Sequence, residues 1–153
     1  MSCRIALGAD HGGFKLKAVL VDYLRKQENK VEDLGTYSEE SCDYPEYGYK
    51  VASAVAEGRA DRGVLVCRSG VGIAIVANRV PGVRAGVCHD AASAAHSRQH
   101  NDTNVLVLGA DHTPAEQAVE ILDAWLRTEF EGGRHARRLA MIEEIEKRIH
   151  LSS

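Results

Sequence analysis

The chain has 153 residues, of which 44% are hydrophobic and 27% are charged, and its formal net charge at pH 7 is −3. Length and composition are those of one globular domain, so we predict a single domain over residues 1–153. The slightly negative charge excludes a general electrostatic attraction to nucleic acid or to an anionic membrane surface.

The N-terminal apolar run is shorter than that of a secretory signal, and no window approaches the roughly 18 apolar residues of a membrane span. The four cysteines are scattered and form no Cys-x-x-Cys pair, which is not the pattern of a disulfide framework. We therefore expect a cytoplasmic protein with reduced thiols. The cysteines are Cys3, Cys42, Cys67 and Cys88.

Short apolar runs alternate with helical patterns along the chain. Runs typical of strands buried on both faces occupy residues 4–9, 30–35, 63–67, 83–88 and 104–109. Helical patterns occupy residues 14–27, 49–58, 72–80, 91–100 and 114–130. In the last of these, Thr113 is expected to be the N-cap and Pro114 the first helical residue. The alternation predicts a three-layer α/β/α sandwich around a five-stranded parallel sheet, a Rossmann-like fold.

One more helical pattern, at about residues 134–150, does not fit the sandwich. It follows Gly132-Gly133 and is charged except for a single apolar stripe. The stripe consists of Leu139, Ile142, Ile145 and Ile149. Since two glycines would let this helix swing away from its own domain, we expect it to contact a partner subunit.

Reactive side chains follow several of the predicted strands, and ligands of open parallel sheets bind beyond the carboxyl ends of the strands. Each of these residues can also be structural, because Asp and Asn are common helix caps. They are Asp10 and His11 after the first strand, Cys67 at the end of the third, His89 and Asp90 after the fourth, and His100, Asn101 and Asp102 one helix later.

The segment CRSGVG, residues 67–72, places a cysteine at a glycine-rich turn before a helix. Such a turn leaves backbone N–H groups unpaired at the positive end of a helix dipole, and can hold a phosphate or a developing oxyanion. It would also increase the thiolate fraction of Cys67. The alternative is a small core cysteine beside a tight loop.

Other motifs fit this chain poorly. A tyrosine phosphatase loop needs Cys-x5-Arg, and Ile73 stands where the arginine would be. A Walker A loop would end in Gly-Lys-Ser/Thr, which is absent. His96 and His100 lie one helical turn apart, as zinc ligands can, but the Glu of the HExxH motif is missing. We therefore predict no metal.

The segment GGRHARR places Arg134 and Arg138 on one face of the last helix, four residues apart. Two guanidiniums near a helix N-terminus make a phosphate clamp. A solvated basic face that answers the acidic EEIE downstream is the other interpretation, and the spacing alone leaves both open.

Taken together, GADHGGF, DYPEYG, CRSGVG, SRQHNDTN and EGGRHARR resemble the ribose-5-phosphate isomerase B family, from about residue 3 to residue 148. The resemblance implies an α/β/α sandwich without cofactor or metal, and a homodimer or dimer of dimers whose active sites are shared between subunits. It implies an isomerase that interconverts ribose 5-phosphate and ribulose 5-phosphate in the pentose phosphate pathway. The alternatives are an isomerase of a six-carbon sugar phosphate (allose 6-phosphate or galactose 6-phosphate) and, in a different class, a non-catalytic sugar-phosphate-binding protein.

The resemblance also assigns roles. It implies Cys67 as the base that moves a proton between C1 and C2, and His100 as the residue that opens the furanose ring. The enediolate oxygen would be stabilised by Ser69 and the backbone N–H groups of Gly70, Val71 and Gly72. The implied ligands of the sugar are Asp10 and Asn101, with Tyr44 as a wall of the pocket, and those of the phosphate are His11, Arg134 and Arg138. In the family, the two arginines come from the subunit opposite the cysteine.

Two positions distinguish this chain within the family. A second branch lacks the cysteine and uses a Glu at the position of Ile73, so Cys67 and Ile73 indicate the thiol branch. The family's turn usually reads Cys-Gly-Thr/Ser-Gly, and this chain has Arg68 at the first glycine position. If that backbone had φ > 0, an arginine would cost roughly 1 kcal/mol or more. We expect Arg68 to point away from the thiol.

Overall fold

The computed structural model describes residues 3–151. Its strands are β1 (Arg4–Ala9), β2 (Lys30–Asp33), β3 (Arg62–Cys67), β4 (Ala85–Val87) and β5 (Val105–Gly109). Its helices are α1 (Phe14–Lys26), α2 (Tyr44–Ala56), α3 (Val71–Ala77), α4 (Ala91–Asn101), α5 (Ala115–Arg127) and α6 (Arg134–Leu151), with a short 3-10 helix, η1 (Ala110–His112), before α5. None of the helices between residues 3 and 151 is both long and apolar enough to span a bilayer.

The five strands form one sheet of order β2-β1-β3-β5-β4, and all neighbouring strands are parallel. This confirms the predicted parallel sheet. From β1 the chain proceeds to β2 on one side, whereas β3 lies on the other side of β1. The strand order therefore reverses between β1 and β3, and in open parallel sheets the ligand crevice lies at such a point.

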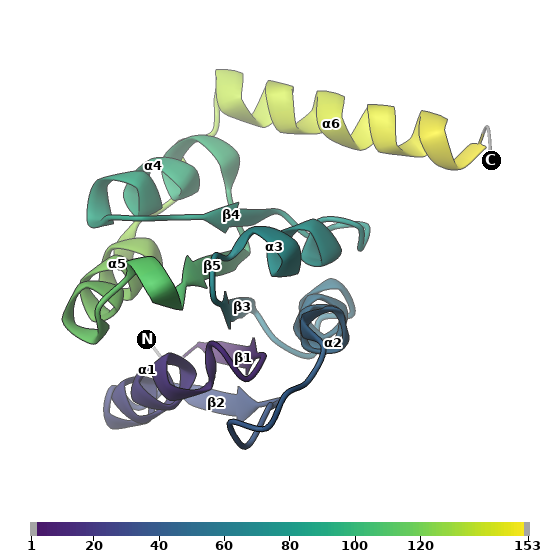
Figure 1. Cartoon of the computed structure of the whole chain (residues 1–153). Helices are drawn as coiled ribbons and strands as arrows, with labels where there is room; N and C mark the ends of the chain where they lie inside the picture. Colours follow the sequence, from purple (N-terminus) through teal and green to yellow (C-terminus); the bar gives the residue numbers. More distant parts are fainter. Residues whose placement is uncertain (1–2, 152–153) are drawn as a thin grey trace.

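The sheet is covered by helices on both faces, so the predicted three layers are confirmed (Figure 1). Alternate residues of the central strands enter two separate cores, as the two-residue period of a strand requires. Helices α1, α4 and α5 close the core that contains Leu7 and Val66, while α2 and α3 close the core that contains Leu65 and Cys67. Cys67 therefore faces α2 and α3.

Helix α6 lies outside the sandwich, beyond α4 (Figure 1). Gly132 and Gly133, with φ of 70° and 56°, form the joint that precedes it, a left-handed conformation that favours glycine. The predicted apolar stripe is present and largely uncovered, since the side chains of Ile142, Ile145 and Ile149 are 45–62% exposed. The segment before the helix is attached to the body, because the Glu131 N–H donates to the carbonyl of Gln99 on α4 at 3.1 Å.

Two local predictions were wrong. Helix α2 begins at Tyr44, five residues before the predicted start at 49, because Pro45 is tolerated in a first turn and Gly48 is needed inside the helix. A Cβ at Gly48 would lie 3.0–3.1 Å from Val76 and Ile73, so glycine lets α2 approach α3 closely. Thr113 does not cap α5: Pro114 occupies the N-cap position, and the buried Thr113 hydroxyl has no hydrogen-bond partner in the structure.

A buried ion pair joins α1 to the end of β2. The Lys17 side chain is 1% exposed, and its Nζ lies 2.6 Å from Asp33 Oδ1. The same oxygen accepts the Gly35 N–H at 3.0 Å, and the Tyr37 hydroxyl donates to the Asp33 carbonyl at 2.8 Å. Asp33 thus fixes the start of the loop that leads to α2.

We expect Asp33→Asn to lower the free energy of unfolding by about 3 kcal/mol, because it leaves a buried ammonium without its carboxylate. Urea denaturation of the variant and the parent measures this. Asp22→Asn is the matched control: it removes an exposed pair with Lys26 and should cost less than about 0.5 kcal/mol. Equal losses in the two variants would contradict the assignment.

Candidate active site

An open pocket of about 500 Å³ lies at the carboxyl ends of β1 and β3, where the strand order reverses. We call it the cysteine pocket. The loop after β1 contributes Asp10 and His11, β3 ends with the thiol of Cys67 and is followed by the glycine turn, and α2 and α3 form the walls. It is lined by Asp10, His11, Tyr44, Cys67, Arg68, Ser69, Val71, Gly72 and Ile75.

Cys67 is the last residue of β3, and its side chain is both a core residue and part of the pocket wall. It is 5% exposed, and its Sγ accepts a hydrogen bond from the Gly70 N–H at 3.2 Å. Gly70 can direct its N–H back to the sulfur because it adopts φ 82°, a conformation that few other residues tolerate. The turn therefore fixes the sulfur at the mouth of the sheet.

Two of the backbone N–H groups of the turn are already used in hydrogen bonds within the turn. The Gly70 N–H is bonded to Cys67, and the Val71 N–H donates to Ser69 Oγ at 3.2 Å. Within residues 3–151, the Gly72 N–H has no such partner. Of the donors predicted for an oxyanion, the Gly72 N–H and the Ser69 hydroxyl proton are therefore the ones left for a ligand.

Tyr44 lines the cysteine pocket beside the turn. Its ring lies directly on the backbone of Gly72, since a Cβ at that position would be 2.5 Å from Tyr44 Cζ. Glycine at 72 is thus required by the close approach of the ring. The sequence pattern suggested the glycine, but the contact comes from a residue 28 positions earlier in the chain.

Asp10 and His11 enter the pocket from the end of β1. Asp10 is 8% exposed, and its Oδ1 accepts the Gly13 N–H at 3.1 Å. His11 Nδ1 accepts the Cys42 N–H at 3.1 Å, so Nε2 is the nitrogen that carries a proton and can donate to a ligand. Cys42 Sγ also lies 3.9 Å from His11 Nδ1, and no sequence pattern pointed to Cys42 in this role.

A second group of predicted residues gathers on α4 and at the base of α6. The rings of His100 and His135 are stacked, with centroids 4.0 Å apart and planes at 12°, and His96 lies edge-on to His100 at 4.0 Å. Glu131 Oε1 lies 3.7 Å from His100 Nε2 and 3.6 Å from His135 Nε2. Together with Arg134 and Arg138 on the first turns of α6, these residues form what we call the histidine–arginine cluster.

The arrangement of the two stacked rings does not suit a metal ion. The ligand atoms of His100, Glu131 and His135 lie within 4.8 Å of one another. A metal binds along an imidazole lone pair, which lies in the ring plane, and two nearly parallel planes 4.0 Å apart cannot both direct Nε2 at one ion.

The expectation that His100 and Asn101 share the carboxyl edge of the sheet with Cys67 was wrong for a single chain. The crossover helix α4 returns the chain to the amino edge, so His100 lies close to the start of β5 at Val105. Cys67 pairs with Gly109, the last residue of β5. None of His100, Asn101, Arg134 and Arg138 lines the cysteine pocket.

Two other polar candidates are structural. Asp90 caps α4, since its Oδ1 accepts the Ser93 N–H at 2.7 Å in a capping box. Asp102 ends α4 in a left-handed conformation, and its carboxylate pairs with Arg98 at 2.7 Å and Arg84 at 3.3 Å.

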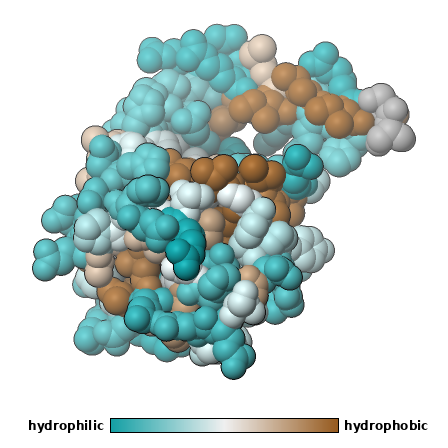
Figure 2. Space-filling model, in the orientation of Figure 1, coloured by the Kyte–Doolittle hydropathy of each residue, from teal (hydrophilic) through white to brown (hydrophobic). Residues whose placement is uncertain are grey.

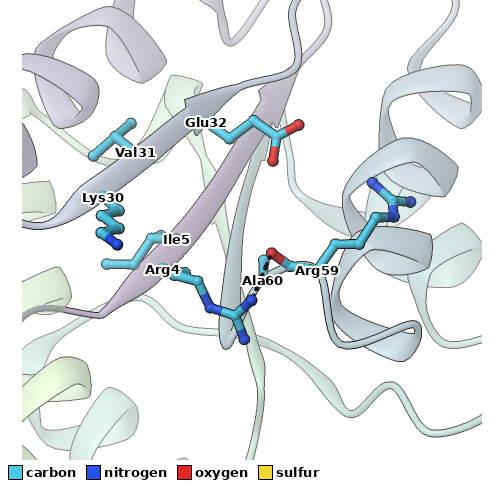
Figure 3. A pocket seen from close by; sticks show the side chains of 7 residues that line it. All are labelled: Arg4, Ile5, Lys30, Val31, Glu32, Arg59 and Ala60. Carbon is cyan, nitrogen blue, oxygen red and sulfur yellow. Dashed lines mark hydrogen bonds between the residues drawn. The ribbon is translucent and has the colours of Figure 1, made fainter.

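A separate pocket of about 170 Å³ opens at the amino ends of β1 and β2 (Figure 3). Arg4, one of the cations that line it, is paired with Asp61 at 2.9 Å and also donates to the carbonyl of Arg59 at 3.4 Å. Because it lies at the edge away from the thiol and the glycine turn, we do not assign it to the reaction.

Comparison with known proteins identifies the family. Residues 5–142 match the model of the Ribose/Galactose Isomerase family, and the chain belongs to this family. Ribose-5-phosphate isomerase B of Escherichia coli (strain K12) is 50% identical over 95% of this chain and 97% of its own length.

Solved structures agree with this assignment. That of Clostridium thermocellum ribose-5-phosphate isomerase B has a TM-score of 0.94 and 50% identity, covering 95% of this chain and 98% of that one. Mycoplasma genitalium ribose-5-phosphate isomerase B, solved with bound ribulose-5-phosphate, has a TM-score of 0.92 and 38% identity, covering 96% of this chain and 98% of that one.

His135 offers a test of the histidine–arginine cluster. Burial, and next the neighbouring His100, lower the pKa of His135. We expect its ring to titrate below the usual value of about 6.5 in an NMR pH titration, with His135→Asn used to assign the signal. As pH falls below that value, the unfolded chain takes up the proton first, so the folded state loses stability. This loss should be smaller in His135→Asn, and a ring that titrates at or above its usual value would contradict the geometry.

Proposed function

We propose that the protein is an aldose–ketose isomerase that interconverts D-ribose 5-phosphate and D-ribulose 5-phosphate, with Cys67 as the general base. The observation that carries the proposal is the Cys67 sulfur, held by a turn N–H at the strand-order reversal beside Ser69 and Gly72. The Escherichia coli relative bears the name of this activity. The pentose phosphate pathway and a cytoplasmic location remain predictions; the four cysteines are all free.

The chemistry follows from the positions of the pocket residues. The Cys67 thiolate removes the proton at C2 of the open-chain aldose, which gives a thiol and a cis-enediolate. Ser69 and the Gly72 N–H donate to the oxygen that carries the developing charge. The thiol then returns the proton to C1, the hydroxyl proton passes from O2 to O1, and the carbonyl of the ketose forms at C2.

The remaining predicted residues bind and open the sugar. His100 passes a proton at the ring oxygen, while Asp10 and Asn101 hold sugar hydroxyls. The phosphate is bound by the Nε2–H of His11 and by the guanidiniums of Arg134 and Arg138. No step in this sequence requires a metal or another cofactor.

The complete site is formed between two copies of the chain. The cysteine pocket and the histidine–arginine cluster lie at opposite ends of β5, so one chain does not bring them together. Apolar residues line the side of α6 that faces the body, and hydrophobic surface also lies on the body across from it (Figure 2). Helix α3 exposes Val71 and Ile75, which both line the cysteine pocket. A homodimer in which α6 crosses to its partner would cover both surfaces, and a dimer of dimers remains a prediction.

The role of the thiol is tested with Cys67→Ala. We expect kcat for ribose 5-phosphate to fall about 10³-fold or more, because the general base is lost, while EDTA leaves the parent's rate unchanged. Cys88→Ala is the matched control, since Cys88 is also buried and free but does not line the pocket. Equal turnover by the Cys67 variant and the parent would make the thiol a core residue. Binding of ribose 5-phosphate without turnover in the parent would favour a sensor.

The shared site is tested by complementation. Cys67→Ala and His100→Ala should each be nearly inactive, and a mixture refolded together should recover about a quarter of the parent's activity, since half of the dimers then hold one intact site of two. The control mixture is the double variant Cys67→Ala/His100→Ala refolded with the parent, which contains each change in the same proportion but places both in one chain. With a shared site it should also show about a quarter of the parent's activity, from parent homodimers, and with a site inside one subunit about half. No recovery in the mixture of single variants would place both residues in the site of one subunit.

A further inference from the structure

Arg68 follows the proposed base directly and stands where related turns usually have glycine. Its backbone does not require glycine, because Arg68 does not have a positive φ. Between residues 3 and 151, Glu28 and Asp102 are the only residues other than glycine that do. Arg68 therefore causes no left-handed strain, and its carbonyl is anchored by the Asp111 N–H at 3.0 Å. What distinguishes this turn is the side chain that it adds to the pocket.

The Arg68 side chain lies across Gly12, in the loop after β1. A Cβ at Gly12 would be 2.5 Å from Arg68 Cγ and 3.2 Å from Nε, so the stem occupies the space that a side chain there would need. Gly12 is the neighbour of His11, and Arg68 and His11 line the same pocket. The stem thus lies beside the loop that carries His11, the residue proposed to bind phosphate, whereas the thiol, Ser69 and Gly72 lie along the turn itself.

The guanidinium has no partner within the part of the chain that the structure describes, in contrast to the buried Arg98, which donates to Asp102 and to the carbonyl of Thr103. The pocket lining contains one carboxylate, Asp10, and one guanidinium, Arg68. Without Arg68, the only formal charge in the lining that this chain supplies would be the negative charge of Asp10. A guanidinium with a packed stem and unused donors suits phosphate, which it can bind with two parallel hydrogen bonds.

We propose that Arg68 is a substrate-binding residue that contacts the phosphate together with His11. It is a third guanidinium beside Arg134 and Arg138, and it is supplied by the same subunit as Cys67. This inference rests on the proposed isomerase function. Because the phosphate is bound alike in substrate and in the transition state, Arg68 contributes to substrate affinity and leaves the proton transfer unchanged.

The test compares Arg68→Met, which keeps the stem over Gly12 and removes the charge, with Arg68→Lys, which keeps a charge. We expect Arg68→Met to raise KM for ribose 5-phosphate about tenfold, with kcat within about twofold of the parent, since one charge-assisted contact is lost. The inhibition constant of inorganic phosphate should rise by a similar factor. Arg68→Lys should lie between the two, and Arg25→Met, which removes an exposed guanidinium outside the pocket, should change neither constant.

Two outcomes would overturn the inference. A fall in kcat with KM unchanged would place Arg68 at the enediolate, and unchanged constants in Arg68→Met would make it a solvated surface residue. Thermal unfolding verifies that the variants fold, and Arg68→Gly, with the family's usual residue, replaces Arg68→Met if that one does not. If the parent has no isomerase activity, the proposed function fails separately. Calorimetric binding of inorganic phosphate to the parent and to Arg68→Met then decides the role of Arg68, and equal affinities would reject it.

Discussion

The site depends on the parallel register of β3 with the strands on either side of it. Val66 is level with Ala9 of β1, and Cys67 is level with Gly109 of β5. This register brings the loop after β1 and the turn after β3 to the same point of the sheet edge, where the strand order reverses. Asp10, His11 and the thiol therefore meet through backbone hydrogen bonding alone, before any of their side chains interact.

The same connectivity keeps the histidine–arginine cluster away from the cysteine pocket. A helix that links parallel strands must return the chain to the amino edge, so His100 at the end of α4 is separated from Cys67 by the length of β5, about 13 Å for five extended residues. A second copy of the chain can bring its own His100 close to Cys67 of the first copy, whereas no rearrangement within one sheet can do so. The exposed apolar stripe of α6 and the exposed apolar residues of α3 give such an association a physical driving force.

The sequence predicted the parts of the molecule that depend on local chemistry. Consecutive apolar runs located the strands. The turn after Cys67 could be predicted because it needs glycine at fixed positions, here Gly70 and Gly72. Contacts between distant segments were not predictable. The backbone of Cys42 orients His11, Tyr44 covers Gly72, and Glu131 joins two histidines, none of which leaves a periodic or spaced pattern. The prediction that Thr113 caps α5 was wrong for a related reason. Threonine suits an N-cap, but here Pro114 takes that position, and the Thr113 hydroxyl is buried without a hydrogen-bond partner among the described residues.

Arg68 shows how a turn of this kind can change its charge and keep its geometry. The hydrogen bond from Gly70 to the sulfur and that from Val71 to Ser69 involve none of its side-chain atoms. Its own φ lies in the ordinary range, so replacing glycine there does not require the thiol to move. The condition for such a change lies in the loop after β1, because Gly12 must leave its face open for the stem. A side chain at residue 12 would displace the guanidinium, so the residues at 12 and 68 together determine the charge on this side of the pocket.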